Sequence, residues 1–297
     1  MRKKELFRGV GTAIITPFTD DGIDFEAFGR LIDLQAEYAD AIIVAGTTGE
    51  APTLTERERD ELLTFAIART EGSIPIIMGT GSNDTGTAVA HTRRACELGA
   101  DGVLVVTPYY NRGTKEGIRR HFQIVAEASC TPVILYHVPA RTGSTLSLAD
   151  YEAILSHPNI LGVKEAEENT EKFFSLCHSF GEEKKIYTGS DTFLLPAMAM
   201  GGSGVISVVS NLYPAKVHSI FHAFEMGDLS KARRDFAEIL PLCRLLFAET
   251  SPAPVKEALR MMGYGNGVCR LPLTSPTPLL SARLHGEIFR LSAGALS

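Results

Sequence analysis

Short apolar runs alternate with amphipathic segments along most of the chain. Each run is only a few residues long and has apolar residues at nearly every position, which is typical of a strand buried on both faces of a parallel sheet. The predicted strands are Gly11–Thr16, Ala41–Ala45, Ile74–Gly79, Gly102–Thr107, Pro132–His137, Ile160–Lys164, Lys185–Gly189 and Gly204–Ser207.

The segments between these runs have the apolar spacing of amphipathic helices. Thr55–Thr70 carries one apolar face, and Thr55 with Glu58 forms a capping-box pattern at its start. Asp84–Leu98 has a similar face and ends before Gly99, a residue typical of a helix C-terminal cap. Strands and helices therefore alternate, which indicates a parallel sheet covered by helices.

Eight strand–helix units favour a closed (β/α)8 TIM barrel of the α/β class. An open doubly wound sheet is the alternative, although such sheets usually have fewer strands. The chain after Ser207 is predicted to be helical, over Pro214–Met226, Leu229–Phe247, Pro254–Met262 and Thr277–Ser292. We expect residues 1–226 to form the barrel domain and residues 227–297 to form a C-terminal helical region.

Composition adds few constraints. The chain has 297 residues, 44% of them hydrophobic and 22% charged, which is ordinary for a globular protein. A net charge of -6 without a basic block argues against nucleic acid or an anionic membrane as a partner. Five widely spaced cysteines, no signal-peptide pattern at the start and no apolar span of about 20 residues predict a cytoplasmic protein.

Lys164 lies near the end of the apolar run Ile160–Lys164, where a lysine is unusual. Burial disfavours the charged ammonium, and a neutral amine can form a Schiff base with a carbonyl compound. The alternative is a lysine whose stem packs at a strand end while its head reaches water. Burial alone leaves both interpretations open.

In a barrel of this kind, active sites form where the strands end. Hydroxyl, phenol and cationic side chains gather at those ends: Gly46-Thr47-Thr48-Gly49-Glu50, Thr107-Pro108-Tyr109-Tyr110-Asn111, Tyr136-His137-Val138-Pro139-Ala140-Arg141-Thr142-Gly143, Lys164 and Gly189-Ser190-Asp191. Strand alternation puts Lys164 on one face with Gly162 and Ile160, and Gly162 would leave space beneath the lysine stem. By the same rule Tyr136 and His137 point to opposite faces.

Several of these features have simpler interpretations. The Gly46–Gly49 segment could be only a strand-to-helix turn, or its N–H groups could hold a carboxylate. Tyr109 and Tyr110 could fill the barrel mouth or an interface. Arg141 could form an ordinary surface ion pair. His218 and His222 lie one helical turn apart, but no third metal ligand is evident, so we expect no metal site.

Taken together, the motifs Gly46-Thr47-Thr48-Gly49-Glu50, Thr107-Pro108-Tyr109-Tyr110-Asn111, Tyr136-x-Val138-Pro139-x-Arg141-Thr142-Gly143 and Gly162-Val163-Lys164-Glu165-Ala166 resemble the dihydrodipicolinate synthase and N-acetylneuraminate lyase family. The resemblance runs from about Phe7 to Leu273, with the motifs in the family's order. It implies a pyruvate-dependent class I lyase that needs neither a metal nor an organic cofactor.

The resemblance implies catalytic roles for four residues. Lys164 would form the imine with pyruvate, and Tyr136 would transfer protons as a general acid and base. Thr47 would link Tyr136 to Tyr110 in a hydroxyl relay, with Tyr110 reaching in from a neighbouring subunit. Such a relay requires at least a dimer, and the resemblance implies a homotetramer built from two tight dimers.

The resemblance also implies a set of substrate-binding residues. Thr48 and the adjoining loop amides would hold the carboxylate of pyruvate, with Ile206 and Gly189 completing that subsite. Arg141 would bind the carboxylate of the second substrate, aspartate semialdehyde. Arginine at this position and the Gly-Thr-Thr-Gly-Glu loop favour the dihydrodipicolinate branch over sialic-acid lyases. Cleavage of another 2-keto-3-deoxy acid, or carboxylate binding without turnover, are the alternative functions.

The sequence departs from the family pattern at several positions. His137 and Ser251 stand where asparagine is common; His137 should alter local hydrogen bonding without abolishing chemistry. Feedback-inhibited members bind lysine through histidines and a glutamate, but Glu56, Arg59 and Thr87 do not fit that pattern, whereas Asn83 and Tyr109 do. We therefore predict weak or absent inhibition by lysine.

Overall fold

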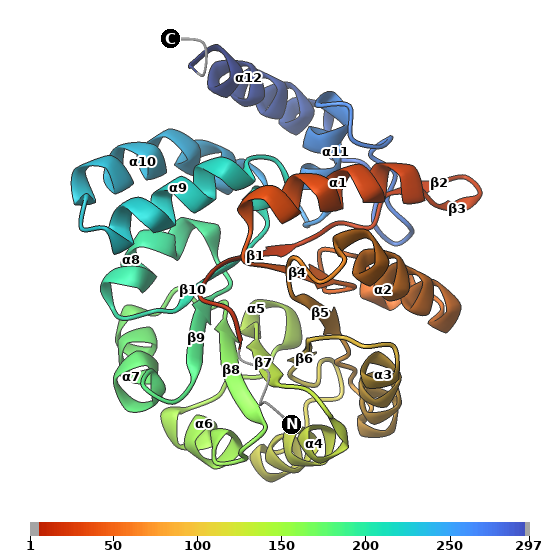
Figure 1. Ribbon diagram of the computed structural model, residues 1–297, viewed down its shortest axis with the longest axis vertical. Helices are drawn as coiled ribbons and strands as arrows, with labels where there is room; N and C mark the ends of the chain where they lie inside the picture. The colour runs from red at the N-terminus through yellow and green to blue at the C-terminus, as the bar shows by residue number, and fades with distance from the viewer. Residues whose placement is uncertain (1–5, 295–297) are drawn as a thin grey trace.

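The computed structural model describes residues 6–294; residues 1–5, the basic start of the chain, and residues 295–297 lie outside it. Eight parallel strands close into a barrel in the order β1-β10-β9-β8-β7-β6-β5-β4, with β1 pairing to β4 (Figure 1). They are β1 (Gly9–Ala13), β4 (Ala41–Val44), β5 (Ile76–Gly79), β6 (Gly102–Val106), β7 (Val133–His137), β8 (Ile160–Glu165), β9 (Lys185–Thr188) and β10 (Gly204–Ser207). The predicted (β/α)8 barrel is confirmed, and the open sheet is excluded.

The first strand lies two residues before its predicted position. Thr12 pairs with Ile42 on one side and Ser207 on the other, so Gly9–Ala13 is the part of the chain that closes the barrel. After it, the Ile15 N–H donates to the side chain of Asn211 at 3.1 Å, and the Thr16 hydroxyl donates to the Gly49 carbonyl at 2.8 Å. Side chains and a loop, rather than a neighbouring strand, take up these groups. A short hairpin, β2 (Phe18–Thr19) and β3 (Gly22–Ile23), follows.

Helices surround the barrel, as Figure 1 shows. They are α1 (Phe25–Tyr38), α2 (Glu56–Thr70), α3 (Thr85–Glu97), α4 (Lys115–Ala128), α5 (Pro139–Thr142), α6 (Leu148–Leu155), α7 (Thr170–Phe180), α8 (Leu194–Ala199) and α9 (Pro214–Glu225), with 3-10 turns η1 (Ala51–Thr53), η2 (Asp191–Phe193) and η3 (Val209–Asn211). The predicted capping box is confirmed, since Thr55 and Glu58 bond each other's backbone N–H groups. Gly99 has φ +95°, as expected after a helix end.

The inside of the barrel has its own apolar cluster, which includes Ile43, Leu104, Ile134 and Ile206. At the end of the barrel where the strands begin, the rings of Phe7 and Tyr187 stack with their centroids 4.5 Å apart, and the Tyr187 hydroxyl donates to the Phe7 carbonyl at 2.6 Å. Both side chains are buried. This end of the barrel is therefore filled, and the open end is the one where the strands finish.

The alternation of side chains is interrupted in β8. Val133 of β7 pairs with Ile160, but the next residue, Ile134, pairs with Gly162, so Leu161 is an extra residue in the ladder. Ile160 consequently packs in the outer cluster between strands and helices, whereas Leu161 contacts the inner cluster. The prediction that Ile160 shares a face with Lys164 is wrong for this reason.

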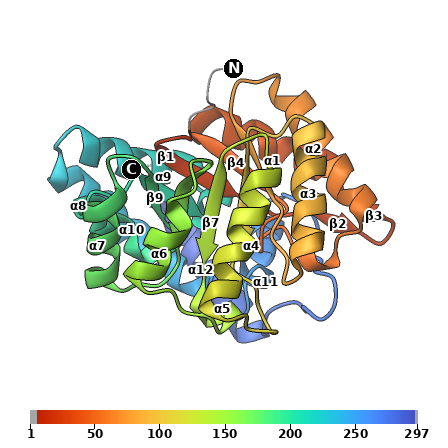
Figure 2. The same ribbon diagram turned by 90° about the horizontal axis from the view of Figure 1, so that it is seen from below.

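The C-terminal region consists of α10 (Leu229–Leu245), α11 (Ala253–Met261) and α12 (Pro278–Gly294). Figure 2 shows α11 and α12 beside the end of the barrel that carries α5, away from the N-terminus. The predicted helices in this region are confirmed, and the domain boundary between residues 226 and 227 stays a prediction. No helix among residues 6–294 is long and apolar enough to cross a membrane.

A buried ion pair joins this region to the loop after β4. The Lys256 ammonium lies 2.5 Å from the Glu50 carboxylate, and both side chains are 1% exposed. The Arg270 N–H donates to the second Glu50 oxygen at 2.9 Å, and Lys256 lies over the ring of Phe18, 4.3 Å from its centroid. Glu50 itself has φ +56°, so the loop turns sharply where this pair holds it.

Replacing Lys256 with alanine should destabilise the protein by about 3–5 kcal/mol, because the Glu50 carboxylate would stay buried without its counter-ion. Urea unfolding followed by circular dichroism measures this free energy. Arg57→Ala, which breaks an exposed pair with Glu61 in α2, is the matched control and should cost under about 1 kcal/mol. Equal losses for the two variants would contradict the prediction.

Candidate active site

Lys164 lies inside the barrel near the open end of β8 and is 5% exposed. Its Nζ lies over the ring of Tyr136, 4.3 Å from the centroid, and the two residues are direct partners in the β7–β8 ladder. Space for the lysine stem comes from Gly189, because a Cβ there would lie 2.8 Å from the Lys164 Cε. The predicted role of Gly162 is wrong, since a Cβ at that position would meet Leu6 and Tyr187 instead.

The surroundings of Lys164 favour a neutral amine. Burial, with a smaller contribution from the positive charge of Arg141, lowers its pKa to about 8, although the Asp191 carboxylate opposes the shift. On the order of a tenth of the amine is then unprotonated at pH 7, far more than for an ordinary lysine. The interpretation of Lys164 as a strand-end lysine with a wet ammonium does not fit this environment. The side chain instead has the properties of a nucleophile.

Tyr136 and Thr47 form the second part of the site. Burial raises the pKa of the Tyr136 hydroxyl, while the charge of Arg141 and a hydrogen bond with the Thr47 side chain act in the opposite direction. Tyr136 is therefore protonated at neutral pH and able to donate. Because its ring lies beside the Lys164 amine, it is in a position to give a proton to an oxygen leaving the carbon that Lys164 attacks.

The loop after β4 supplies backbone donors. The Gly49 N–H donates to the Gly46 carbonyl at 3.1 Å and the Glu50 N–H to the Thr47 carbonyl at 3.1 Å, which folds the segment into a tight turn. Within residues 6–294, no hydrogen bond engages the N–H groups of Thr47 and Thr48. Thr48 is also buried. Unpaired amides in a turn of this kind form a site for a carboxylate.

Asp191 belongs to one of the strand-end motifs, but the sequence analysis gave it no role. It is buried in η2, and its Oδ2 accepts hydrogen bonds from the N–H groups of Val208 and Val209 at 3.0 and 2.9 Å. Burial raises the pKa of its carboxyl, against these hydrogen bonds and the charge of Lys164. Asp191 thus holds the segment after Ile206 and opposes the loss of the Lys164 proton. The available signal was an acidic residue two positions after a predicted strand.

Arg141 and Tyr110 occupy more open positions. Arg141 belongs to α5 and donates from Nη2 to the Ser251 carbonyl at 3.1 Å, which holds it at the mouth of the site. Tyr110 is 90% exposed and has φ +70° in the loop after β6. The structure therefore does not bring Tyr110 to Tyr136 and Thr47 of its own subunit. Its predicted role in a neighbouring subunit stays a prediction.

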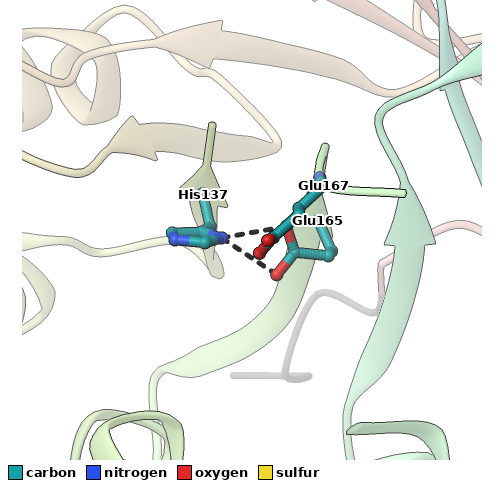
Figure 3. Close-up of side chains that lie close together, drawn as sticks. All are labelled: His137, Glu165 and Glu167. Atoms are coloured by element: carbon teal, nitrogen blue, oxygen red, sulfur yellow. Dashed lines mark hydrogen bonds and ion pairs between the residues drawn. The ribbon is translucent and has the colours of Figure 1, made fainter. Parts of the chain in front are cut away.

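Among the described residues, one group of side chains is close enough to hold a metal ion: His137, Glu165 and Glu167, with ligand atoms within 4.8 Å of one another (Figure 3). The ammonium of Lys172 lies 2.8 Å from Glu167 and 3.7 Å from Glu165, where it supplies the positive charge that a metal would supply. The cluster lies behind the sheet, on the face opposite Lys164. Its residues fit an ion-pair network better than a metal site.

The sequence profile of the Dihydrodipicolinate synthetase family matches residues 6–284. The chain belongs to this family. It is 46% identical to the 4-hydroxy-tetrahydrodipicolinate synthase of Alkaliphilus oremlandii over 95% of this chain and 98% of that protein. Its structure is similar to the crystal structure of dihydrodipicolinate synthase from Aquifex aeolicus, with TM-score 0.94 and 40% identity over 96% and 98% of the two chains. A synthase variant described as monomeric has TM-score 0.94 and 37% identity over 96% of each chain.

Within this family member, a cleft of about 440 Å³ continues from Tyr136 and Thr47 toward the start of α2 and α3. Arg59, Glu56 and Thr87 line it, and Glu56 is paired with His91 at 2.7 Å. Arg59 is buried and donates to the Gly79 carbonyl. The cleft therefore presents a fixed guanidinium next to a carboxylate that already has a partner.

Reductive alkylation of Lys164 by a small aldehyde and borohydride should increase with pH through about 8 and then level, because only the neutral amine reacts. Peptide mass spectrometry at each pH locates and quantifies the adduct. Arg141→Met should move the midpoint to higher pH, since it removes a positive neighbour. A midpoint near 10.5, the ordinary lysine value, would contradict the assignment.

L-lysine should bind weakly or not at all in the cleft beside Arg59, because that guanidinium repels an ammonium group and Thr87 offers no carboxylate. Titration calorimetry with millimolar L-lysine is the measurement, and turnover in its presence should be unchanged. Saturable binding in the micromolar range, or inhibition at such concentrations, would refute this expectation.

Proposed function

We propose that this protein condenses pyruvate with L-aspartate 4-semialdehyde to 4-hydroxy-tetrahydrodipicolinate through an imine on Lys164. The observation that carries the proposal is the buried Lys164 amine, with its lowered pKa, in contact with the Tyr136 ring. Membership of the dihydrodipicolinate synthetase family supports the choice of reaction. This reaction belongs to the biosynthesis of diaminopimelate and lysine.

Imine formation follows from the geometry. The neutral Lys164 amine attacks the carbonyl carbon of pyruvate, whose carboxylate binds the free N–H groups of Thr47 and Thr48. Tyr136 donates a proton to the departing oxygen, so that water leaves and a protonated imine remains. Thr47, which is hydrogen-bonded to Tyr136, returns the proton through the hydroxyl relay. Tyr136 and Thr47 then carry a proton from the methyl carbon away along the same relay, which gives the enamine.

The second substrate enters beside Arg141. Its guanidinium is held by the Ser251 carbonyl at the mouth of the site and is suited to a bidentate grip on a carboxylate. The enamine carbon attacks the aldehyde, and the aldehyde oxygen becomes the hydroxyl group of the product. Attack of the substrate's own amino group on the imine carbon closes the ring and releases Lys164. Neither a metal nor an organic cofactor takes part, because the protonated imine accepts the electrons.

We also propose that the protein assembles as a homotetramer of two tight dimers. The exposed Tyr110, with its strained backbone, is suited to completing the Tyr136–Thr47 relay of a neighbouring subunit.

A cytoplasmic location is supported by the free cysteines, none of which is in a disulfide among residues 6–294.

Borohydride reduction in the presence of pyruvate tests the imine step. We expect one adduct, on Lys164, detected by mass spectrometry and absent from Lys164→Arg.

A coupled assay with aspartate semialdehyde then tests the second substrate. Arg141→Met should raise KM for that substrate by on the order of a hundredfold while the pyruvate adduct still forms.

Two results would overturn the proposal in different ways. No adduct with pyruvate would leave a barrel that only binds a carboxylate. An adduct without turnover of aspartate semialdehyde, combined with cleavage of another 2-keto-3-deoxy acid, would assign the protein to a related lyase reaction.

A further inference from the structure

A polar cluster lies directly behind the two catalytic side chains. Tyr136 pairs with Lys164 in the β7–β8 ladder, and the next pair along the same ladder is His137 with Glu165. Successive side chains point to opposite faces of a strand. Tyr136 and Lys164 therefore face the inside of the barrel, and His137 and Glu165 face the surrounding helices, where both side chains are 0% exposed (Figure 3).

Hydrogen bonds occupy both nitrogens of the His137 ring. The Leu146 N–H donates to Nε2 of His137 at 3.2 Å, so this nitrogen is the acceptor and the proton lies on Nδ1. Nδ1 in turn donates to Glu165, 2.9 and 3.0 Å from its two carboxylate oxygens. Both ring nitrogens of His137 are therefore engaged in hydrogen bonds. The imidazole connects the loop before α6 to the end of β8.

Glu165 is the centre of the cluster and is ionised. Besides His137, its carboxylate accepts from the Tyr151 hydroxyl at 2.5 Å and from the Glu167 N–H at 2.8 Å, and the Lys172 ammonium lies 3.7 Å away. Burial works against the charged carboxylate, but these hydrogen bonds outweigh it and hold the pKa of Glu165 below its ordinary value. A buried charge with this many partners has one well-defined position.

We propose that His137 and Glu165 are positioning residues for the imine chemistry: by bonding to each other across β7 and β8, they hold Tyr136 against Lys164. This inference rests on the proposed function. Neither residue touches substrate; both act through the neighbouring residue on the same strand. The extra residue at Leu161 shifts the register earlier in this ladder, and the cluster fixes the pairing directly after the catalytic pair.

The charge of Glu165 also acts on Tyr136. Burial raises the pKa of the Tyr136 hydroxyl and Glu165 adds a smaller contribution in the same direction, whereas Arg141 and Thr47 lower it. The fixed carboxylate therefore offsets part of the effect of Arg141. A tyrosine that must donate a proton to a leaving hydroxyl benefits from this balance, because it stays protonated over a wider range of pH.

Four variants separate positioning from simple loss of structure; one of them, His137→Phe, removes both hydrogen bonds of the imidazole. Glu165→Gln removes the charge and keeps the shape; Tyr151→Phe removes one hydrogen bond and keeps the charge; His137→Asn keeps a donor for Glu165 and an acceptor for the Leu146 N–H. Each is compared with wild type for kcat, KM for pyruvate, the borohydride adduct on Lys164 and the alkaline limb of the pH–rate profile.

For Glu165→Gln we expect kcat to fall by on the order of ten- to a hundredfold, the adduct on Lys164 to form more slowly, and the alkaline limb to move to lower pH. Tyr151→Phe should lower kcat less and leave the alkaline limb in place. His137→Asn should retain kcat within about threefold of wild type, whereas His137→Phe should behave like Glu165→Gln in kcat.

The two proposals fail in distinguishable ways. If wild type forms no adduct with pyruvate, the proposed function is wrong. If wild type reacts normally and folded Glu165→Gln keeps both its kcat and its alkaline limb, the positioning role is wrong. Should Glu165→Gln not fold, an equal kcat for His137→Phe and His137→Asn overturns the proposal on its own.

Discussion

The register between β7 and β8 is the constraint on which the site depends. It makes Tyr136 the direct neighbour of Lys164 on the inner face and His137 the neighbour of Glu165 on the outer face. If one strand were shifted by one residue, its side chains would point to the opposite face, and Tyr136 and Lys164 would no longer be neighbours inside the barrel. The hydrogen bonds of His137 and Glu165 oppose such a shift, so the chemistry inside the barrel is held in place from outside it.

The properties of Lys164 come from the contrast between the two ends of the barrel. Below it, Phe7 and Tyr187 fill the interior and exclude water. Above it, the site opens toward Arg141 and the turn after β4. The amine thus lies at the boundary between a dry interior and a polar mouth, where desolvation lowers its pKa while a substrate can still reach it.

Much of the fold was predictable because the spacing of apolar residues in a strand or a helix indicates which of its faces are buried. The eight strands, the capping box of α2 and the opposite directions of Tyr136 and His137 follow from local patterns. The bulge at Leu161 did not follow, since an extra residue in a ladder is defined by the partner strand and leaves no mark in a continuous apolar run.

The candidate site was only partly predictable, for a related reason. The glycine that accommodates Lys164 is Gly189 of the next strand, a contact across the sheet that alternation within one strand cannot identify. The hydrogen bonds of Asp191 to Val208 and Val209 are likewise long-range. Residue types and their order indicated which strand ends carry the chemistry. Which side chains meet there depends on packing between elements.

The pairing of Glu50 with Lys256 has a consequence for folding during synthesis on the ribosome. The two residues are 206 positions apart, so while the chain is being synthesised the turn after β4 leaves the ribosome long before its counter-ion exists. All eight barrel strands precede Lys256 in the sequence. A nascent barrel therefore has every strand and Lys164, but the turn after β4 lacks its buried counter-ion until Lys256 is synthesised.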